Sequence, residues 1–173
     1  MDIDFIVISE DDIKKRVAEL GLQISEDYKD KEILVICVLR GAAVFMSDLI
    51  RRITPPVEID FVTVSSYGSS TTSSGEINMT CDINSNIVGK HVLIVEDIID
   101  TGLTMSYLKE SLLQRNPASL KICAFLDKPS RRKVELATDY IGYEIEDHFV
   151  VGYGLDFNQK GRQLPYIAAI KHD

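Results

Sequence analysis

The amino-acid sequence predicts an α/β domain in which helices flank a mostly parallel central sheet. Ile33–Leu39 is a continuous apolar run rich in β-branched residues, which is typical of a strand covered on both faces. Segments with apolar residues at helical spacing lie between runs of this kind, and the alternation favours parallel strands connected through helices. Ligands of such sheets bind beyond the carboxyl ends of the strands.

The N-terminal half contains the first predicted elements. Ser9 is expected to cap a helix whose first turn carries Glu10, Asp11 and Asp12. Gly21 is expected to end this helix, because glycine is common just after the last helical residue. The elements expected next are a strand over Ile33–Leu39, a helix over Val44–Ile53 and a strand over Val57–Val64.

The C-terminal half continues the same alternation. The expected elements are a strand over His91–Val95, a helix over Met105–Gln114, and strands over Leu120–Leu126, Tyr140–Ile145 and Phe149–Gly152. Between the two halves, Ser66–Gly75 contains no aliphatic residue and cannot contribute to a core. This segment is either a solvated linker or a mobile loop.

Composition restricts the class of protein. The 173 residues fit a single domain over 1–173, and a net charge of −8 argues against non-specific nucleic-acid binding, which requires a basic surface. The longest apolar run is too short to cross a bilayer, and the acids among the first residues are unlike a signal peptide. We therefore expect a cytoplasmic protein without a membrane partner. Cys37, Cys81 and Cys123 lack the spacing of metal ligands and are expected to be reduced thiols.

The most informative segment is HVLIVEDIIDTGLT. An apolar strand leads into Glu96 and Asp97, and Asp100 follows before Thr101–Thr104 and a helix. A loop that joins a strand to a helix N-terminus directs unpaired amides and a positive dipole end towards one point. Gly102 permits the backbone to approach a ligand closely. The sequence therefore predicts a site for a monophosphate.

Three carboxylates beside a phosphate would repel it unless another group intervenes. They can accept hydrogen bonds from sugar hydroxyls or bind a hard cation such as Mg²⁺, and one of them can act as a general base. A ribose 5-phosphate would satisfy both the amides and the acids. In the competing interpretation the acids are only the polar end of a strand, and Asp100 or Thr101 caps the following helix.

Val95–Thr104 (VEDIIDTGLT) resembles the phosphoribosyl pyrophosphate motif of type I phosphoribosyltransferases. Further segments resemble the hypoxanthine-guanine branch of that family: LRGA (39–42), SSYG (65–68), DKPSRR (127–132) and FVVGYGLDFNQKGRQLPY (149–166). The resemblance implies the type I phosphoribosyltransferase fold, with a small hood formed by the N- and C-terminal segments.

The resemblance also implies an enzyme of purine salvage. Such an enzyme converts hypoxanthine or guanine, with phosphoribosyl pyrophosphate and the cofactor Mg²⁺, to a purine nucleoside 5′-monophosphate and pyrophosphate. Members of the family generally form homodimers or homotetramers. One alternative is a regulatory protein that keeps this fold to sense phosphoribosyl pyrophosphate or nucleotides, which the acidic charge disfavours. Another is a receiver-like phospho-acceptor domain, whose acids should lie nearer the N-terminus.

Within the motif, the resemblance assigns each residue a role. Glu96 and Asp97 would hold the ribose hydroxyls, directly or through Mg²⁺, and Asp100 would be the general base near the imidazole nitrogen of the purine. The 5-phosphate would be bound by Asp100, Thr101, Gly102, Leu103 and Thr104. Leu103 replaces a basic residue of the animal members, so the phosphate would depend more on backbone amides.

Residues outside the motif are assigned by the same resemblance. Lys128 would donate to the purine 6-oxygen, Phe149 would stack on the base and Val150 would contribute a backbone carbonyl. Asp156 would bind a second magnesium ion, and Arg162 would contact pyrophosphate. Each also has a common structural interpretation, such as a solvated cation, a core aromatic residue or a turn-forming aspartate.

Two loops complete the implied site. Leu39, Arg40 and Gly41 resemble the family's pyrophosphate loop, in which a non-proline cis peptide bond is typical. Ser66 and Tyr67 resemble the start of a mobile lid, here about 66–78, that closes over the reacting atoms. An inert surface loop would have the same composition.

Overall fold

The computed structural model describes residues 1–66 and 76–171, and within them the main feature is a six-stranded sheet in the order β4-β3-β2-β5-β6-β7. Neighbouring strands are parallel except for the edge pair β3 and β4. The predicted mostly parallel sheet is therefore confirmed. The strands are β2 (Ile33–Leu39), β3 (Val57–Ser66), β4 (Ile77–Cys81), β5 (His91–Ile99), β6 (Ser119–Asp127) and β7 (Tyr140–Glu144).

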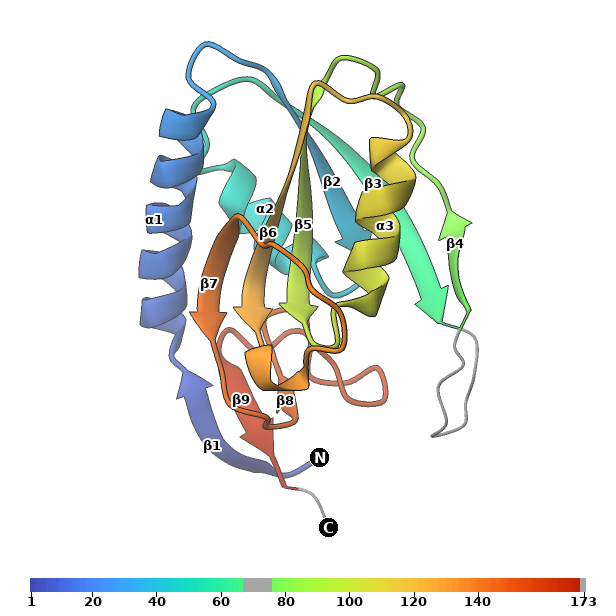
Figure 1. Cartoon of the computed structure of the whole chain (residues 1–173). Helices are drawn as coiled ribbons and strands as arrows, with labels where there is room; N and C mark the ends of the chain where they lie inside the picture. The colour runs from blue at the N-terminus through green and yellow to red at the C-terminus, as the bar shows by residue number, and fades with distance from the viewer. Residues whose placement is uncertain (67–75, 172–173) are drawn as a thin grey trace.

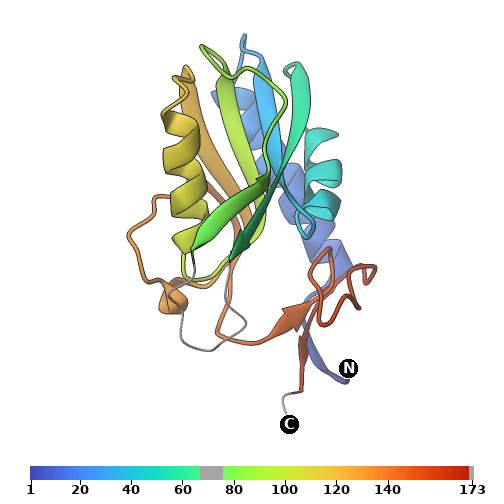
Figure 2. The same cartoon turned by 90° about the vertical axis from the view of Figure 1, so that its right-hand side faces the viewer.

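Helices cover both faces of this sheet (Figure 1). They are α1 (Glu10–Asp27), α2 (Ala43–Ile50) and α3 (Leu103–Leu113). The edge-on view in Figure 2 shows α1 and α2 on one face and α3 on the other. Val35 packs with α1 and α2, whereas its neighbours Leu34 and Ile36 pack with α3, so burial on both sides explains the unbroken apolar run. In the described part of the chain, no helix has the length and apolarity that crossing a membrane requires.

A second, smaller sheet lies beyond the carboxyl ends of the parallel strands (Figure 1). Within the described residues its three antiparallel strands follow the order β1-β9-β8. The strands are β1 (Ile3–Ile8), β8 (Val150–Val151) and β9 (Ile167–Ile170). The two terminal segments thus form the small hood that the family resemblance implied, and they place it at the end of the sheet where ligands bind.

The first helix is longer than predicted. Ser9 caps it as expected, since its hydroxyl accepts the Asp12 N–H at 3.2 Å, but the helix continues through Gly21 to Asp27. Gly21 is needed for packing and does not end the helix, because an added Cβ atom would lie 2.3 Å from the Cβ atom of Arg52. A sequence pattern cannot distinguish a glycine that ends a helix from one that lets another segment approach it.

Two strands also differ from their predicted lengths. β5 continues to Ile99 instead of ending at Val95, since its pairing with β6 extends that far. β8 is limited to Val150–Val151, because Gly152 adopts a left-handed φ of 103° and turns the chain. The extension of β5 matters for function, since it makes the acidic residues part of a strand supported by β6.

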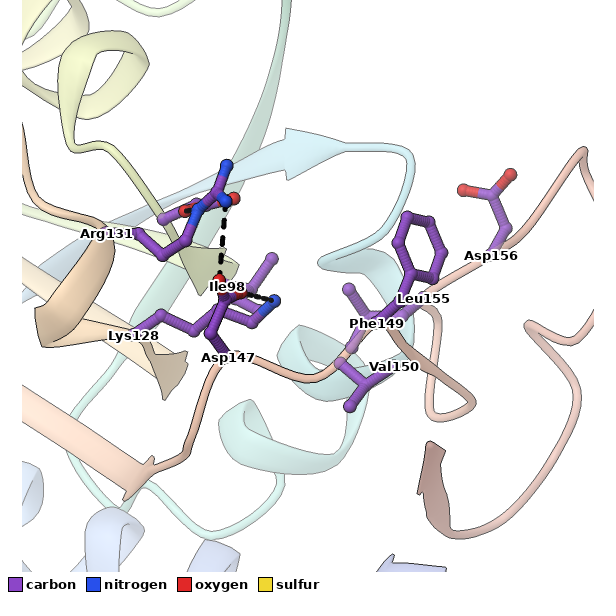
Figure 3. A pocket seen from close by; sticks show the side chains of 9 residues that line it. Ile98, Lys128, Arg131, Asp147, Phe149, Val150, Leu155 and Asp156 are labelled. Atoms are coloured by element: carbon purple, nitrogen blue, oxygen red, sulfur yellow. Dashed lines mark hydrogen bonds and ion pairs between the residues drawn. The ribbon is translucent and has the colours of Figure 1, made fainter. Parts of the chain in front are cut away.

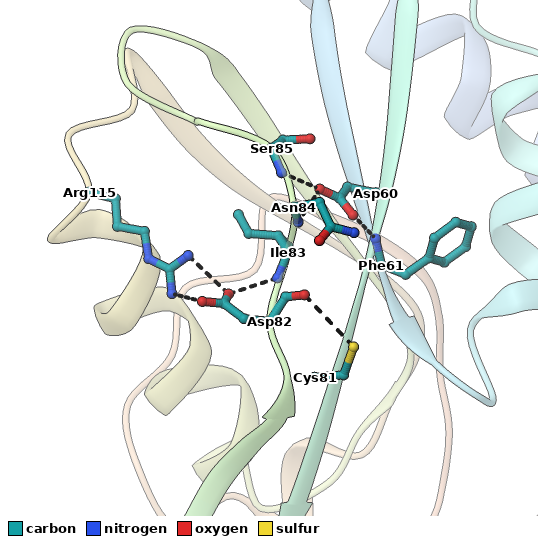
Figure 4. Close-up of polar contacts among 8 residues, drawn as sticks. All are labelled: Asp60, Phe61, Cys81, Asp82, Ile83, Asn84, Ser85 and Arg115. Carbon is teal, nitrogen blue, oxygen red and sulfur yellow. Dashed lines mark hydrogen bonds and ion pairs between the residues drawn. The ribbon is translucent and has the colours of Figure 1, made fainter.

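A polar network fixes the connection between β4 and β5 (Figure 4). Asp60 of β3 is buried and accepts the backbone N–H groups of Phe61, Asn84 and Ser85 at 2.7, 2.9 and 2.8 Å. Burial opposes ionisation of this carboxyl, but these hydrogen bonds prevail and lower its pKa. The charged Asp60 therefore ties the connection to the sheet.

Candidate active site

β5 carries its acidic residues past the point where β2 stops pairing with it. The β2–β5 pairing ends at Val95, whereas β6 continues to pair with β5 on the other side. Val95 and Ile98 both pack into the core beside α1 and α2, although a regular strand would place them on opposite faces. The strand is therefore irregular at Glu96 and Asp97.

Glu96 and Asp97 form a pair of carboxyl groups with little access to solvent. Glu96 is 9% exposed, and its Oε1 accepts the backbone N–H of Asp97 at 2.8 Å. Burial, together with the neighbouring Asp97 charge, raises the pKa of Glu96. Burial also raises the pKa of Asp97, although the nearby Arg162 acts in the opposite direction. A cation or a sugar hydroxyl would therefore stabilise the ionised pair.

The following residues form a small cavity at the N-terminus of α3. It has a volume of about 140 Å³ and is lined by Glu96, Ile98, Ile99, Asp100, Thr101, Gly102, Thr104 and Met105. Gly102 is the N-cap with a φ of 84°, and the first intrahelical bond runs from the Ser106 N–H to the Gly102 carbonyl at 2.9 Å. The preceding amides have no partner within the helix. The Thr101 hydroxyl accepts the Leu103 N–H at 3.3 Å but does not occupy the cap position.

The segment after β6 supports this loop from outside. Arg132 Nη1 donates to the backbone carbonyl of Asp100 at 2.9 Å, and the Lys133 N–H donates to the carbonyl of Thr101 at 2.9 Å. The left-handed φ of 84° at Gly102 disfavours other residues, and an added Cβ atom would also lie 2.9 Å from Arg132 Cδ. The phosphoribosyl pyrophosphate motif and the end of the DKPSRR segment are therefore in direct contact.

A larger cavity of about 440 Å³ adjoins the small one, and both are lined by Ile98 and Asp100. Figure 3 shows Lys128, Arg131 and Asp147 on one side of it and Phe149 and Asp156 on the other. The residues that line it are Ile98, Asp100, Lys128, Arg131, Asp147, Phe149, Val150, Leu155 and Asp156. Five candidate residues from distant parts of the sequence thus meet in one cavity: Asp100, Lys128, Phe149, Val150 and Asp156.

The polar side of the larger cavity is built on the short 3₁₀ helix η1 (Pro129–Arg131). Lys128 is 7% exposed, and its Nζ lies 3.4 Å from Asp147 Oδ1. Arg131 Nε donates to Asp100 Oδ1 at 2.8 Å. Arg131 and Asp147 were not predicted from the sequence as site residues. Arg131 belongs to the DKPSRR segment, which signalled the family without indicating this contact, and no pattern around Asp147 distinguishes it.

The other side of the cavity comes from the C-terminal segment. Phe149 is 41% exposed, and its ring packs edge-on against Phe157 with centroids 5.5 Å apart. Val150 is buried in β8. Asp156 Oδ1 lies 2.9 Å from Arg162 Nη2, so the carboxylate already neutralises the arginine. A metal ion at Asp156 would compete with Arg162 for it.

The loop after β2 lies against the acidic pair. The peptide bond between Leu39 and Arg40 is cis, as the family resemblance implied. A Cβ atom on Gly41 would lie 1.6 Å from Asp97 Oδ2, and a Cβ atom on Gly154 would lie 2.1 Å from the carbonyl oxygen of Gly41. The loops that follow β2 and β8 therefore meet beside Asp97, and glycine makes both approaches possible.

The predicted lid lies largely outside the described residues. Ser66 is the last residue of β3, whereas Tyr67 belongs to the range 67–75, which the structure does not describe. Ile77 and Asn78, also in the predicted lid, belong to β4.

The carboxylates of this site fit part of a metal site and not a complete one. Among the described residues, no three His, Cys, Asp or Glu side chains are grouped so that they could hold a metal ion by themselves. Glu96 and Asp97 nevertheless fit part of a magnesium site, because Mg²⁺ is usually held by one or two carboxylates together with substrate phosphates. The low exposure of the pair and its shared negative charge also favour a cation there.

Comparison with known proteins shows which family the chain belongs to. A family profile described as a phosphoribosyl transferase domain matches residues 9–158. The chain belongs to the phosphoribosyltransferase family. It is 51% identical over 168 residues to hypoxanthine phosphoribosyltransferase from Haemophilus influenzae, which covers 95% of this chain and 94% of that protein. It is 49% identical over 170 residues to hypoxanthine-guanine phosphoribosyltransferase from Bacillus subtilis, covering 98% and 94%.

Solved structures agree with this assignment. A crystal structure of a hypoxanthine-guanine phosphoribosyltransferase from Bacillus anthracis aligns with a TM-score of 0.94 at 48% identity, covering 98% of this chain and 100% of the other. A hypoxanthine phosphoribosyltransferase from Staphylococcus aureus aligns with a TM-score of 0.95 at 45% identity, covering 98% and 92%. The fold of this phosphoribosyltransferase is thus the type I fold that its motif predicted.

Proposed function

We propose that this phosphoribosyltransferase acts in purine salvage, where it transfers the ribose 5-phosphate of phosphoribosyl pyrophosphate to hypoxanthine or guanine and releases pyrophosphate. The observation that carries the proposal is the pair of cavities that share Ile98 and Asp100. One lies at a helix N-terminus and suits a monophosphate, while the other has an aromatic wall and a buried lysine and suits a 6-oxopurine. The high similarity to named hypoxanthine phosphoribosyltransferases supports it.

In the base cavity, each side chain has a distinct task. The Lys128 ammonium can only donate, so it would bind the 6-oxygen of hypoxanthine or guanine and disfavour the 6-amino group of adenine. Phe149 would stack on the face of the base, and the backbone carbonyl of Val150 would accept a hydrogen bond from its edge. Asp100, which lines both cavities, would take the proton from the purine nitrogen that attacks the sugar.

In the sugar phosphate cavity, the acids and the amides bind different groups. Glu96 and Asp97 would accept hydrogen bonds from the ribose hydroxyls, and the amides of Thr101–Thr104 would bind the 5-phosphate together with Asp100. Mg²⁺ bound at one site beside Glu96 and Asp97, and at a second site beside Asp156, would supply positive charge for the pyrophosphate leaving group. Arg162 would contact pyrophosphate directly, and so would the loop formed by Leu39, Arg40 and Gly41.

The reaction is a substitution at the anomeric carbon of the ribose. The bond from that carbon to the pyrophosphate oxygen breaks, the bond to the purine nitrogen forms, and the proton on that nitrogen passes to Asp100. Positive charge develops on the sugar as pyrophosphate leaves, and the nearby carboxylates stabilise it. A lid over about 66–78, beginning at Ser66 and Tyr67, would exclude water that could otherwise capture this sugar.

We further propose that the enzyme acts in the cytoplasm as a homodimer or homotetramer. Cys37, Cys81 and Cys123 are free thiols, which is consistent with a reducing compartment. Ile59 and Phe61 leave 47% and 38% of their surface exposed on β3, and self-association would cover such apolar surface.

One assay tests the function. The protein is mixed with Mg²⁺, phosphoribosyl pyrophosphate and hypoxanthine, and we expect inosine monophosphate and pyrophosphate in equal amounts, with no product from adenine. The variant Asp100→Asn is the control. Because it lacks the proton acceptor, its turnover should fall by about 100-fold with little change in substrate affinity. Binding of phosphoribosyl pyrophosphate without any product would instead favour the regulatory alternative.

A further inference from the structure

Four charged side chains form a continuous chain along the polar side of the larger cavity (Figure 3). Asp100 Oδ1 accepts from Arg131 Nε at 2.8 Å. Arg131 Nη1 lies 3.4 Å from Asp147 Oδ2, and the other oxygen of Asp147 lies 3.4 Å from Lys128 Nζ. The chain alternates acid and base, so its charges balance. It joins Asp100 and Lys128, which would contact opposite parts of the purine.

The backbone fixes this chain as well. The Lys128 N–H donates to the Ile99 carbonyl at 2.9 Å, and the Arg131 N–H donates to the Lys128 carbonyl at 3.1 Å. The helix η1 is thereby attached to the end of β5, close to Asp100. Arg131 uses two different nitrogen atoms for its two acids, and its planar guanidinium sets the angle between them. A lysine at this position would carry the charge without fixing this angle.

Arg131 contacts only one of the two carboxylate oxygens of Asp100. Arg131 holds Oδ1, so Oδ2 is the oxygen that can accept a proton from a base in the cavity. Asp147 has the complementary effect on Lys128. The buried ammonium requires a counter-charge, and the two long 3.4 Å contacts of Asp147 are weak enough for a purine oxygen to replace one of them.

We propose that Arg131 and Asp147 are positioning residues, which together fix the proton acceptor Asp100 and the 6-oxygen donor Lys128 at a set separation across the purine. This inference rests on the proposed purine transfer and adds two residues to it. Arg131 orients Asp100 directly, and Asp147 holds Arg131 and Lys128. Neither residue needs to touch the reacting atoms.

A purely stabilising role is a weaker account of the Arg131 pair. Asp100 and Arg131 side chains are 43% and 46% exposed, and ion pairs at such exposure contribute little to folding. By contrast, the neighbouring Arg132 pairs with the buried Asp127, where removing one partner would leave a buried charge. Substitution of Arg131 should therefore leave the fold intact, which makes a kinetic test informative.

The test compares Arg131→Ala, Arg131→Lys and Asp147→Asn with the wild-type protein, using hypoxanthine and phosphoribosyl pyrophosphate. In Arg131→Ala we expect kcat to fall by about 10- to 100-fold, because a misplaced acceptor loses productive geometry, while KM for phosphoribosyl pyrophosphate stays within about twofold.

The two other variants separate charge from geometry. Arg131→Lys should restore only part of kcat, because lysine keeps the positive charge but lacks the planar guanidinium that fixes the angle between the two carboxylates. Asp147→Asn should raise KM for hypoxanthine several-fold, because Lys128 is no longer held in position. The matched control is Arg115→Ala, because Arg115 forms a similarly exposed pair with Asp82 at 2.9 and 3.0 Å (Figure 4). Arg115 follows the C-terminal end of α3, whereas Asp100 precedes its N-terminus. Arg115→Ala should change neither constant.

An unchanged kcat in Arg131→Ala would overturn the inference while leaving the proposed function intact. An equal loss in Arg115→Ala would overturn it too. If Arg131→Ala does not fold, as judged by thermal unfolding, then a normal KM for hypoxanthine in Asp147→Asn is the result that refutes it. Absence of product with the wild-type protein would instead refute the proposed function itself.

Discussion

At the scale of the residue, the acidic pair on β5 is a source of instability in the protein without its substrates. Glu96 is buried beside a second carboxyl, and burial raises the pKa of both above their ordinary values. Groups of this kind are retained where a ligand or cation compensates for them. The same residues that suit a sugar hydroxyl or Mg²⁺ should therefore reduce the stability of the folded chain at neutral pH.

The variant Glu96→Gln tests this. A folded-state pKa above the ordinary 4.5 means that the native protein keeps a proton which the unfolded chain has lost. The free energy of unfolding of the wild type should therefore fall as pH rises from about 4.5 through the raised pKa. Glutamine removes the contribution of Glu96 to this fall, so the variant should be more stable than the wild type by about 1 kcal/mol at pH 7.5.

Thermal unfolding at pH 4.5 and 7.5 measures the effect. The difference between the two proteins should be largest at pH 7.5, and the variant should bind phosphoribosyl pyrophosphate more weakly. Glu135→Gln is the control, because Glu135 is exposed. Wild-type and Glu96→Gln stability curves that run parallel from pH 4.5 to 7.5 would contradict the interpretation.

Sequence and structure agree on where a cavity forms when chemistry and chain order coincide. Asp100 and Gly102 follow directly from a strand that leads into a helix, and the cavity at the helix N-terminus lies where the sequence placed it. Arg131 and Asp147 could not be found in this way. Their contacts depend on how η1 and the segment before β8 approach Asp100 in space, and no local spacing encodes that.

At the scale of the element, glycines decide how closely the loops approach one another. Gly41 and Gly154 bring the loops after β2 and β8 together beside Asp97. Gly21 has a similar role between α1 and the end of α2, where the sequence predicted a helix end. Hydrophobic periodicity predicts which segments become helices and strands, but it does not indicate where two backbones approach each other closely. The positions of the strands were therefore predicted more accurately than the residues at which helices and strands end.

The substitution Gly41→Ala tests the approach of the β2 loop. Its Cβ atom would lie 1.6 Å from Asp97 Oδ2, so the carboxylate must move, and a short side chain can move at low cost to the fold. We expect KM for phosphoribosyl pyrophosphate to rise by about tenfold or more, with a small change in Tm. Steady-state kinetics and thermal unfolding measure the two effects.

Gly89→Ala provides the opposite expectation. Nothing lies within 4 Å of its added Cβ atom, but its φ of 71° is unfavourable for alanine. It should lower stability by about 1 kcal/mol and leave KM unchanged. A normal KM in Gly41→Ala would show that Asp97 tolerates displacement and has no precise role in binding.

At the scale of the whole molecule, an aromatic cluster joins the large sheet to the active-site segment. Phe125 of β6 is buried, and its ring lies 5.0 Å from Phe45 of α2 and 5.0 Å from Tyr153. The hydroxyl of Tyr153 donates to Asp48 of α2. Tyr153 precedes Gly154, which contacts the β2 loop. The core beside α1 and α2 is therefore continuous with the loops around Asp97, whereas the core beside α3 supports the phosphate loop.

This continuity predicts that two equally buried substitutions will have different functional effects. Phe125→Leu removes the ring that packs on Tyr153, and Leu112→Val removes one methylene at the end of α3 far from its N-terminus. Each should lower the free energy of unfolding by about 1 kcal/mol or somewhat more. Only Phe125→Leu should also raise KM for phosphoribosyl pyrophosphate, since Tyr153 loses its packing partner and the loop that carries Asp156 and Arg162 loosens. Urea unfolding and steady-state kinetics on both variants measure this, and equal KM values at matched losses of stability would show that the aromatic cluster supports the fold without influencing the site.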